Sequence, residues 1–387
     1  MAKEKKLPKP GFVDRILFRY YRKKLKANAG VSNDELEIVS EAEKAVIRKQ
    51  TIRTSIVASF LGVMGMLTLY IPKYIWPDFF GIAITHKIPF IDGEQEFEWV
   101  FMLFSIILAQ IETYLLVYYN AKAVANIANA NGFPVVTAPD FEKHMNSLVV
   151  VALEKPDRNI KKFGIDPYYG LSKFGLFISM LIIRFKATLS NIFVKLIVSR
   201  ILGRAVLRIY IDFVGLLVYP AWNVYASIQI INESKVRIMA PNLIRRLVDR
   251  LYLEFGTDSL FERKLYNTLN FISQVKRNYN FNLYLLTDAV IQTFNIEKPS
   301  TLQNTTEYIE HIKTLPHKER NGLLRLIIFG MLIDGKLTRR ERRILQRLYD
   351  EKVSGIPETT TEQWSLDYLH GRGMAGFMAH GNFAGSI

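Results

Sequence analysis

Two carboxylates stand seven positions apart in the stretch GMLIDGKLTRRERRIL, at Asp334 and Glu341, on either side of a tight Asp-Gly turn. Carboxylate oxygens are the ligands that a divalent cation prefers, so the pair is a candidate metal site. Thr338 and Glu341 also have the spacing of a capping box, in which both side chains bond backbone N–H groups at the start of a helix. A cap accounts for Glu341, whereas the sequence names no structural partner for Asp334.

A helix that ends in Ile-Asp-Gly-Lys, followed by Leu-Thr and an acidic residue, resembles the tellurite-resistance TerB-like family of helical domains. The resemblance covers at most the C-terminal third of the chain, and its specific part is 330–345. In that family the acidic residues around this turn are linked to metal binding, which implies a divalent cation at Asp334 and Glu341. The surrounding basic residues weaken such a site; they stand at positions 336, 339, 340, 342 and 343. Three interpretations of this turn are therefore kept: a purely structural helix junction, a metal site, and a surface that docks a partner protein.

The sequence carries no recognisable catalytic constellation. Its six histidines form no HxxxH or HExxH spacing, and phosphate-binding glycine loops, a GxSxG elbow and kinase signatures are absent. The chain contains no cysteine, which excludes thiol catalysis and zinc-thiolate sites. We therefore predict that the protein is not an enzyme, and that it has no cofactor other than the divalent cation considered above.

Long apolar runs predict membrane-spanning helices in a chain that is 49% hydrophobic. The runs 54–72 and 99–121 each approach the roughly 20 residues that a helix needs to cross a bilayer, and the second carries one charge, Glu112. Trp76 and Trp99 stand at their ends, as in the aromatic belt of a membrane protein. A buried core helix of a soluble protein is the alternative interpretation of each run.

A third region, 171–205, is interrupted by basic residues and predicts a broken, re-entrant or interfacial segment. The region 206–232 contains a further uncharged run and predicts a last span, with a kink at Pro220. Four membrane segments are therefore expected within 54–232, and three are the alternative.

The distribution of Lys and Arg predicts the orientation of these segments. Basic residues are abundant in 1–53 and again after 232, but sparse between 73 and 98. By the positive-inside rule, the N-terminus and the C-terminal part lie in the cytoplasm, and the acidic 73–98 loop lies outside. The expected location is a bacterial-type inner membrane.

Five ionisable residues fall in or near the apolar runs: Glu112, Arg184, Lys186, Arg208 and Asp212. An unpaired charge at membrane depth costs at least a few kcal/mol, so such groups either pair or line a wet path. Arg208 and Asp212 are four positions apart and can pair on one helix face. Structural ion pairs and the passage of ions or protons both remain open, with Glu112 as the first residue to test for passage.

The region 1–53 predicts two helical pieces before the first span. The stretch GFVDRILFRYYRKKL forms a basic amphipathic helix that either rests on anionic lipid headgroups or packs on the protein's own soluble domain. The residues expected to contact headgroups are Arg15, Arg19, Arg22 and Lys23. Ser32 and Glu35 form a second capping-box pattern, which predicts a helix that runs into the first span.

The segment 233–353 predicts an all-α bundle, because its apolar residues recur at helical spacing. Glycine, asparagine or proline breaks the pattern at positions 256, 280, 299, 316 and 335. Ser259 and Glu262 predict a further helix cap. The segment 354–387 is glycine-rich and predicts a mobile tail, unless its Met and Phe residues dock on a partner.

These patterns together predict an all-α, polytopic membrane protein with a C-terminal helical-bundle domain. A formal net charge of +15 suits an anionic lipid surface, and no nucleic-acid-binding motif accompanies it. Expected partners are membrane lipids and membrane-associated proteins, with self-assembly as a further option, and not nucleic acid. The function predicted is that of a scaffold or signalling adaptor. The alternatives are an ion or proton channel or transporter that uses Glu112 and Asp212, and a metal-responsive stress regulator.

Overall fold

The computed structural model describes most of the chain in two compact units. The described residues are 12–26, 38–87, 94–136, 138–153, 159–168, 207–256, 258–299 and 303–385, with the backbone alone for 12–14, 83–87, 94–97 and 207–217. The first unit, here the helical unit, comprises Met1–Ile47, Val124–Leu176 and Asn232–Ile387. The second, here the apolar unit, comprises Arg48–Ala123 and Phe177–Ile231. The expected third membrane segment, 171–205, lies outside the described residues.

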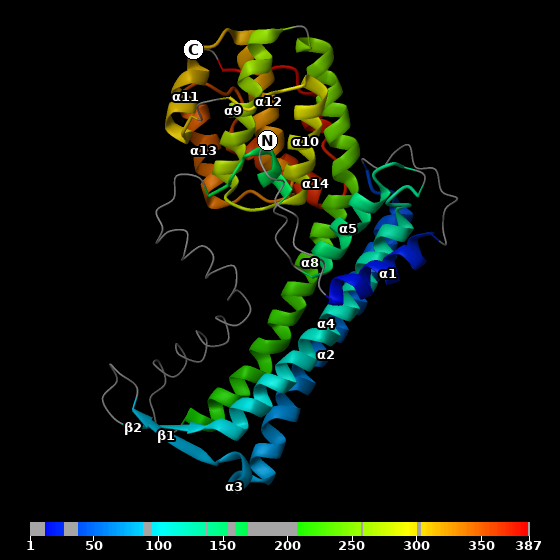
Figure 1. Ribbon diagram of the computed structural model, residues 1–387, viewed down its shortest axis with the longest axis vertical. Helices are drawn as coiled ribbons and strands as arrows, with labels where there is room; N and C mark the ends of the chain where they lie inside the picture. Colours follow the sequence, from blue (N-terminus) through cyan, green and yellow to red (C-terminus); the bar gives the residue numbers. More distant parts are fainter. Residues whose placement is uncertain are drawn as a thin grey trace, which may run out of the picture. The chain divides into compact units, whose positions relative to one another are not determined.

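Three long helices supply the apolar unit and run side by side within it (Figure 1). They are α2 (Glu41–Ile75), α4 (Trp99–Ala130) and α8 (Leu207–Phe255). Both long apolar runs of the sequence are thus helical, and α2 and α4 are long and apolar enough to cross a membrane. The described part of α8 is one continuous helix through Pro220 and contributes to both units.

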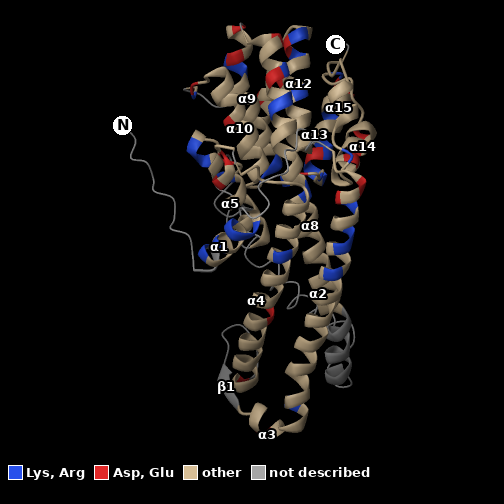
Figure 2. Cartoon of the chain, turned by 90° about the vertical axis from the view of Figure 1, so that its right-hand side faces the viewer, with Lys and Arg blue, Asp and Glu red and all other residues tan. Residues whose placement is uncertain are grey.

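The outward faces of α2 and α4 are apolar, and Figure 2 shows them almost free of charge where they run together. In the most apolar 18-residue window of α4, no residue is buried, and in that of α2 only 22% are. The core helix of a soluble protein would bury most of such a window. Ile56 and Phe60 of α2 and Ile107 of α4 are among the exposed large side chains, at 64%, 61% and 50% exposure.

A β-hairpin lies between these two helices, where the sequence predicted only an acidic loop. After the short helix α3 (Pro77–Phe80), strand β1 (Ala83–Lys87) pairs antiparallel with β2 (Glu94–Glu98). The fold is therefore helical with one small sheet in the described residues. Alternating side chains and an Asp-Gly pair between the strands were the available signal, because such pairs favour hairpin turns.

The helical unit contains the bundle that the sequence predicts. Its remaining helices are α1 (Phe12–Lys26), α5 (Phe141–Ala152), the 3-10 helix η1 (Asn159–Phe163), α9 (Ser259–Lys276), α10 (Phe281–Phe294), α11 (Thr305–Lys313), α12 (His317–Leu332), α13 (Arg339–Asp350), α14 (Glu358–Leu369) and α15 (Ala375–Ala379). Helix α9 contacts α10, α11, α12 and α13. Apolar side chains such as Leu269 and Phe329 are fully buried in this core.

Helix α1 packs against α5 inside the helical unit. The apolar side chains Leu17, Tyr21 and Leu25 are buried. The packing of α1 on its own domain, one of the two alternatives for this helix, is therefore what occurs.

Two helices start at caps that the sequence analysis did not name. Helix α2 starts at Glu41, and its capping box joins Ser40 and Glu43: Ser40 N donates to Glu43 Oε2 at 2.6 Å, and Glu43 N donates to Ser40 Oγ at 3.3 Å. The expected cap at Ser32 lies outside the described residues. Helix α9 is capped by Asp258, which accepts from two backbone N–H groups, and not by Ser259. A carboxylate one position earlier satisfies the same backbone donors.

The segment 354–387 is folded over its described part and is not a mobile tail. It forms α14 and α15, and Trp364, Phe377 and Phe383 pack together with ring centroids 5.0 to 6.1 Å apart. Backbone bonds fix its end, for example from Gly355 N to Phe383 O at 2.9 Å. The apolar residues that suggested docking on a partner dock on their own domain, because their burial offsets the ordering of a glycine-rich chain.

Replacement of Gly371 tests how this segment is anchored. Gly371 has a φ of +78°, and a Cβ at this position would lie 2.8 Å from Val39 Cγ2. The carbonyl oxygen of Gly371 accepts a hydrogen bond from Val39 N at 2.9 Å. We expect Gly371→Ala to lower the free energy of unfolding by about 1–2 kcal/mol, the cost of a left-handed conformation in an L-residue. Gly381→Ala is the control, because a Cβ there meets nothing within 4 Å. Equal effects of the two variants in denaturant unfolding would contradict this account of the turn.

Candidate functional site

An ion cluster surrounds the buried Lys276 in the helical unit. Its Nζ atom lies 2.7 Å from Glu341 Oε1, 3.0 Å from Asp334 Oδ2 and 2.9 Å from the carbonyl oxygen of Met331. The Lys276 side chain is 0% exposed. Because an ammonium group has three N–H donors, these three acceptors satisfy it completely.

Local sequence signals place the two carboxylates of this cluster. Thr338 and Glu341 form the predicted capping box of α13: Thr338 N donates to Glu341 Oε2 at 2.6 Å, and Glu341 N donates to Thr338 Oγ1 at 3.3 Å. Asp334 follows the end of α12, and its Oδ1 accepts from Lys336 N at 3.4 Å. Glu341 thus uses one oxygen for the cap and the other for Lys276.

Lys276 is the structural partner that sequence reasoning did not assign to Asp334. The apolar stripe of α9 runs through Leu265, Leu269 and Ile272, and the next position of that stripe is Lys276. A lysine on the core face of a helix was the signal, because such a charge needs a buried counter-charge. The partner lies on another helix, so the spacing of the sequence could not identify it.

Burial and charge act in opposite directions on the ionisable groups of the cluster. Burial lowers the pKa of Lys276, but the nearby Asp334 and Glu341 carboxylates outweigh it, so this pKa lies above its usual value. Burial raises the pKa of Asp334, and the negative charge of Glu341 adds to that shift while Lys276 opposes it. The cluster therefore holds an ammonium between two carboxylates that compete for it.

This arrangement bears directly on the metal site implied by the TerB-like resemblance. The ammonium of Lys276 lies where a cation shared by Asp334 and Glu341 would have to bind. Among the described residues, no group of three or more His, Cys, Asp or Glu side chains is arranged to hold a metal ion. The geometry favours an ion cluster that fastens α9 to the α12–α13 junction.

Glu112 lies at the packing of three helices in the apolar unit. Asn223 Nδ2 of α8 donates to Glu112 Oε1 at 2.5 Å and lies 3.5 Å from the carbonyl oxygen of Ala58 on α2. Among the described residues, Glu112 makes this one hydrogen bond and no ion pair. A carboxylate held by a neutral amide differs from the structural ion pair that the sequence also allowed.

Small residues of α2 make room for this contact. A Cβ at Gly65 would lie 2.9 Å from Glu112 Oε2, and a Cβ at Gly62 would lie 2.8 Å from Pro220 Cα. Small residues at helix contacts let backbones approach closely, as is common between helices in membranes. Gly62 and Gly65 therefore set the positions of both the carboxylate and α8.

The other predicted membrane-depth residues do not join this site in the described structure. Arg208 and Asp212 belong to α8, but their side chains are outside the described part. Arg184 and Lys186 lie outside the described residues altogether. The grouping of Glu112 with Asp212 thus stays a prediction, whereas Asn223 is a partner of Glu112 that the sequence analysis missed.

The basic side of α1 is exposed, as expected for headgroup contact. Arg15, Arg19, Arg22 and Lys23 all reach solvent, and Arg22 Nη2 lies 3.8 Å from Glu142 Oε1. Leu17, Tyr21 and Leu25 of α1 are covered by protein, whereas Ile16 is 48% exposed, so any lipid contact of α1 would be made by the charged side chains together with Ile16.

Comparison of the chain with protein-family models, with curated proteins and with solved structures finds no match in any of the three. The TerB-like resemblance of 330–345 therefore stays an expectation from the sequence.

Proposed function

We propose that the protein is anchored in a membrane by its apolar unit and acts as a scaffold or adaptor whose helical unit docks partner proteins. The exposed apolar faces of α2 and α4 carry this proposal. Their most apolar windows are 22% and 0% buried, which suits hydrocarbon rather than water or a protein core.

The proposed topology follows the charges of the sequence. We infer four membrane segments in a bacterial-type inner membrane, with the third within 171–205 and the last in the first half of α8. Basic residues flanking the spans favour a cytoplasmic N-terminus and helical unit. Helix α8 contributes residues to both units, so one element of the chain belongs to the proposed anchor and to the proposed docking domain.

Replacement of Ile107 by lysine tests the anchor. Ile107 is 50% exposed near the middle of the apolar run of α4, and a lysine at the centre of a membrane helix costs about 2.5 kcal/mol. We expect Ile107→Lys to reduce the carbonate-resistant membrane fraction, because the charge opposes insertion. Leu253→Lys is the matched control, since Leu253 is 86% exposed on α8 in the helical unit. If both variants stay in the membrane fraction as the wild type does, the proposal fails.

The docking role has a separate test in native membranes. Partner proteins are cross-linked to the wild type and to Lys276→Met, in which the helical unit is destabilised. We expect the variant to remain in the membrane and to lose those partners. Undiminished partner capture by a variant with a disordered helical unit would rule out docking through this domain.

A second candidate function, the passage of protons or other ions, is favoured by Glu112. Among the described residues, the Glu112 carboxylate has a neutral amide as its hydrogen-bond partner in an apolar unit, and carboxylates at membrane depth mark ion pathways in many membrane proteins. Purified protein in liposomes would show a flux that Glu112→Gln abolishes. The absence of any flux from the wild type would leave Glu112 with a structural role.

A further inference from the structure

Helix α13 gathers arginines near its N-terminus, where its sequence begins Arg-Arg-Glu-Arg-Arg. The side chain of Glu341 is 1% exposed and binds Lys276, so its charge is balanced in the interior and not by the surface arginines. Arg342 Nη2 lies 2.8 Å from Glu362 Oε1 of α14. The other three arginines have no hydrogen-bond or ion-pair partner among the described residues; they are Arg339, Arg340 and Arg343, here called the arginine face.

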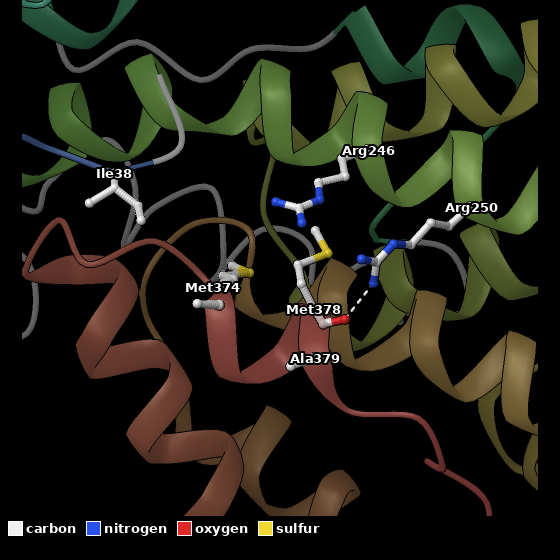
Figure 3. A pocket seen from close by; sticks show the side chains of 7 residues that line it. Ile38, Arg246, Arg250, Met374, Met378 and Ala379 are labelled. Atoms are coloured by element: carbon white, nitrogen blue, oxygen red, sulfur yellow. Dashed lines mark hydrogen bonds between the residues drawn. The ribbon is translucent and has the colours of Figure 1, made fainter. Parts of the chain in front are cut away.

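Other arginines of the helical unit are held by protein acceptors. Arg250 Nη1 donates to the carbonyl oxygen of Met378 (Figure 3), and Arg325 Nη1 lies 2.9 Å from Glu254 Oε2. The arginine face differs, because two of its side chains are exposed, the third is half-buried, and no described residue fixes any of them. A guanidinium carries five N–H donors. Those of the arginine face are therefore available to an anionic ligand in solution.

The arginine face does not stabilise the helix that carries it. The N-terminus of a helix bears a partial positive charge, which disfavours cations and favours anions within the first turn. Arg339 and Arg340 lie in that turn of α13. A local charge preference is thus broken with no gain for folding, as is typical of functional positions. The same partial charge strengthens the attraction of this surface for an anion.

We propose that the arginine face docks an acidic helix of a partner protein. This inference rests on the proposed adaptor function and gives the chemistry of its docking partner. Arg343 is four positions from Arg339 and three from Arg340, so it adjoins both on the helix surface. Carboxylates three or four positions apart on a partner helix have the same spacing, and each guanidinium binds a carboxylate through two parallel N–H···O bonds. Three such pairs form a small contact, which suits transient and salt-sensitive docking.

A protein partner fits this face better than a lipid surface does. Segments that bind anionic lipids gather roughly four to eight Lys or Arg residues, whereas the arginine face has three. A helix that rests on a bilayer also inserts apolar side chains between the lipids. Leu345 and Leu348 of α13 are 2% and 1% exposed, so they are buried in the domain and cannot insert into a bilayer.

The test uses the full chain in a neutral detergent and the fluorescence anisotropy of a labelled, alanine-based helical peptide of about 20 residues. The peptide carries Glu at every fourth position. We expect saturable binding to the wild type, and about tenfold weaker binding to the triple variant Arg339→Gln/Arg340→Gln/Arg343→Gln, as expected for three surface ion pairs. Raising NaCl from about 0.1 M to about 1 M should remove most of the binding. A peptide with Gln in place of Glu should not bind.

The matched control is Arg245→Gln/Arg263→Gln/Arg277→Gln, which removes the same charge from three exposed and scattered arginines. This variant should bind the peptide as the wild type does. Urea unfolding should show that the arginine-face variant is no less stable than the wild type, because its substitutions remove cations from the positive end of α13. A loss of stability would show that these arginines support the fold, and would overturn the proposal. No binding by the wild type, or an equal loss in both triple variants, would overturn it as well.

Two further results separate this proposal from its alternatives. Phosphatidylglycerol added to the detergent micelles at the same concentration of charge should displace little of the peptide. Full displacement would assign the arginine face to a lipid surface and overturn the proposal. In native membranes, the arginine-face variant should lose the partners that Lys276→Met loses. If Lys276→Met loses partners and the arginine-face variant keeps them, docking through the helical unit stands and its placement on α13 fails.

Discussion

Lys276→Met is expected to lower the stability of the helical unit by about 3–5 kcal/mol, the usual cost of removing one partner from a buried ion cluster. The substitution retains much of the side-chain volume but leaves the Asp334 and Glu341 carboxylates buried without their counter-ion. It also leaves the carbonyl of Met331 without its donor. Hydrogen exchange of the full chain in detergent, read for α9 and α12, would measure the loss as faster exchange of the core amides.

Two further variants separate the charge effect from loss of packing. Asp334→Asn alone is expected to change stability by less than about 1 kcal/mol, because removal of one of two competing carboxylates leaves a balanced pair. In the Lys276→Met background, the same Asp334→Asn change should restore part of the lost stability. No recovery in the double variant would mean that packing, and not unpaired charge, causes the defect.

The same variants test the metal-responsive alternative. With Lys276 in place, added calcium should not stabilise the helical unit, because the ammonium occupies the position between the carboxylates. A ligand that binds only the folded state raises stability in proportion to its occupancy. Stabilisation by calcium that depends on Asp334 would therefore favour a metal site over a structural cluster.

The features that the sequence predicts well are those set by neighbouring residues. The bundle helices follow from apolar spacing, and the cap of Thr338 on Glu341 follows from two residues three positions apart. The apolar runs of α2 and α4 predicted helices, because a segment that crosses a bilayer needs its backbone groups bonded internally. Each of these signals lies within one element.

The features that the sequence could not predict depend on residues far apart in the chain. Lys276 meets Asp334 only because α9 packs against α12, and Asn223 meets Glu112 only because α8 packs against α4. The glycine content of the C-terminal segment predicts a mobile tail, whereas the burial of Phe383 depends on the rest of the domain. In each case the partner is decided by tertiary packing, which single-sequence patterns do not contain.

His144 is expected to make the helical unit acid-sensitive. Its ring lies 5.3 Å from that of Phe133 and 6.3 Å from that of Phe281. Burial lowers the pKa of His144 to about 4 from the usual value of 6.5; the negative charge of Asp140 opposes this shift, whereas the positive charges of Lys143 and Arg245 add to it. Between pH 4 and pH 6.5, His144 is therefore protonated in the unfolded state but mostly neutral in the folded state.

The sign of the effect follows from this lowered pKa. The stability contributed by neutral His144 is complete above pH 6.5 and is lost as the pH falls toward 4, by up to about 3 kcal/mol.

His144→Phe, which cannot take up a proton and fits among the neighbouring aromatic rings, should reduce the dependence of the free energy of unfolding on pH between 4 and 6.5. Replacement of the exposed His370 by glutamine is the control, and it should leave the slope unchanged. Urea unfolding of the full chain between pH 4 and pH 8 would give the three profiles. Parallel curves for the wild type and His144→Phe would show that other groups cause the acid sensitivity. If only His144→Phe flattens the dependence of the free energy of unfolding on pH, protonation of the His144 imidazole on α5 accounts for the acid sensitivity of the helical unit.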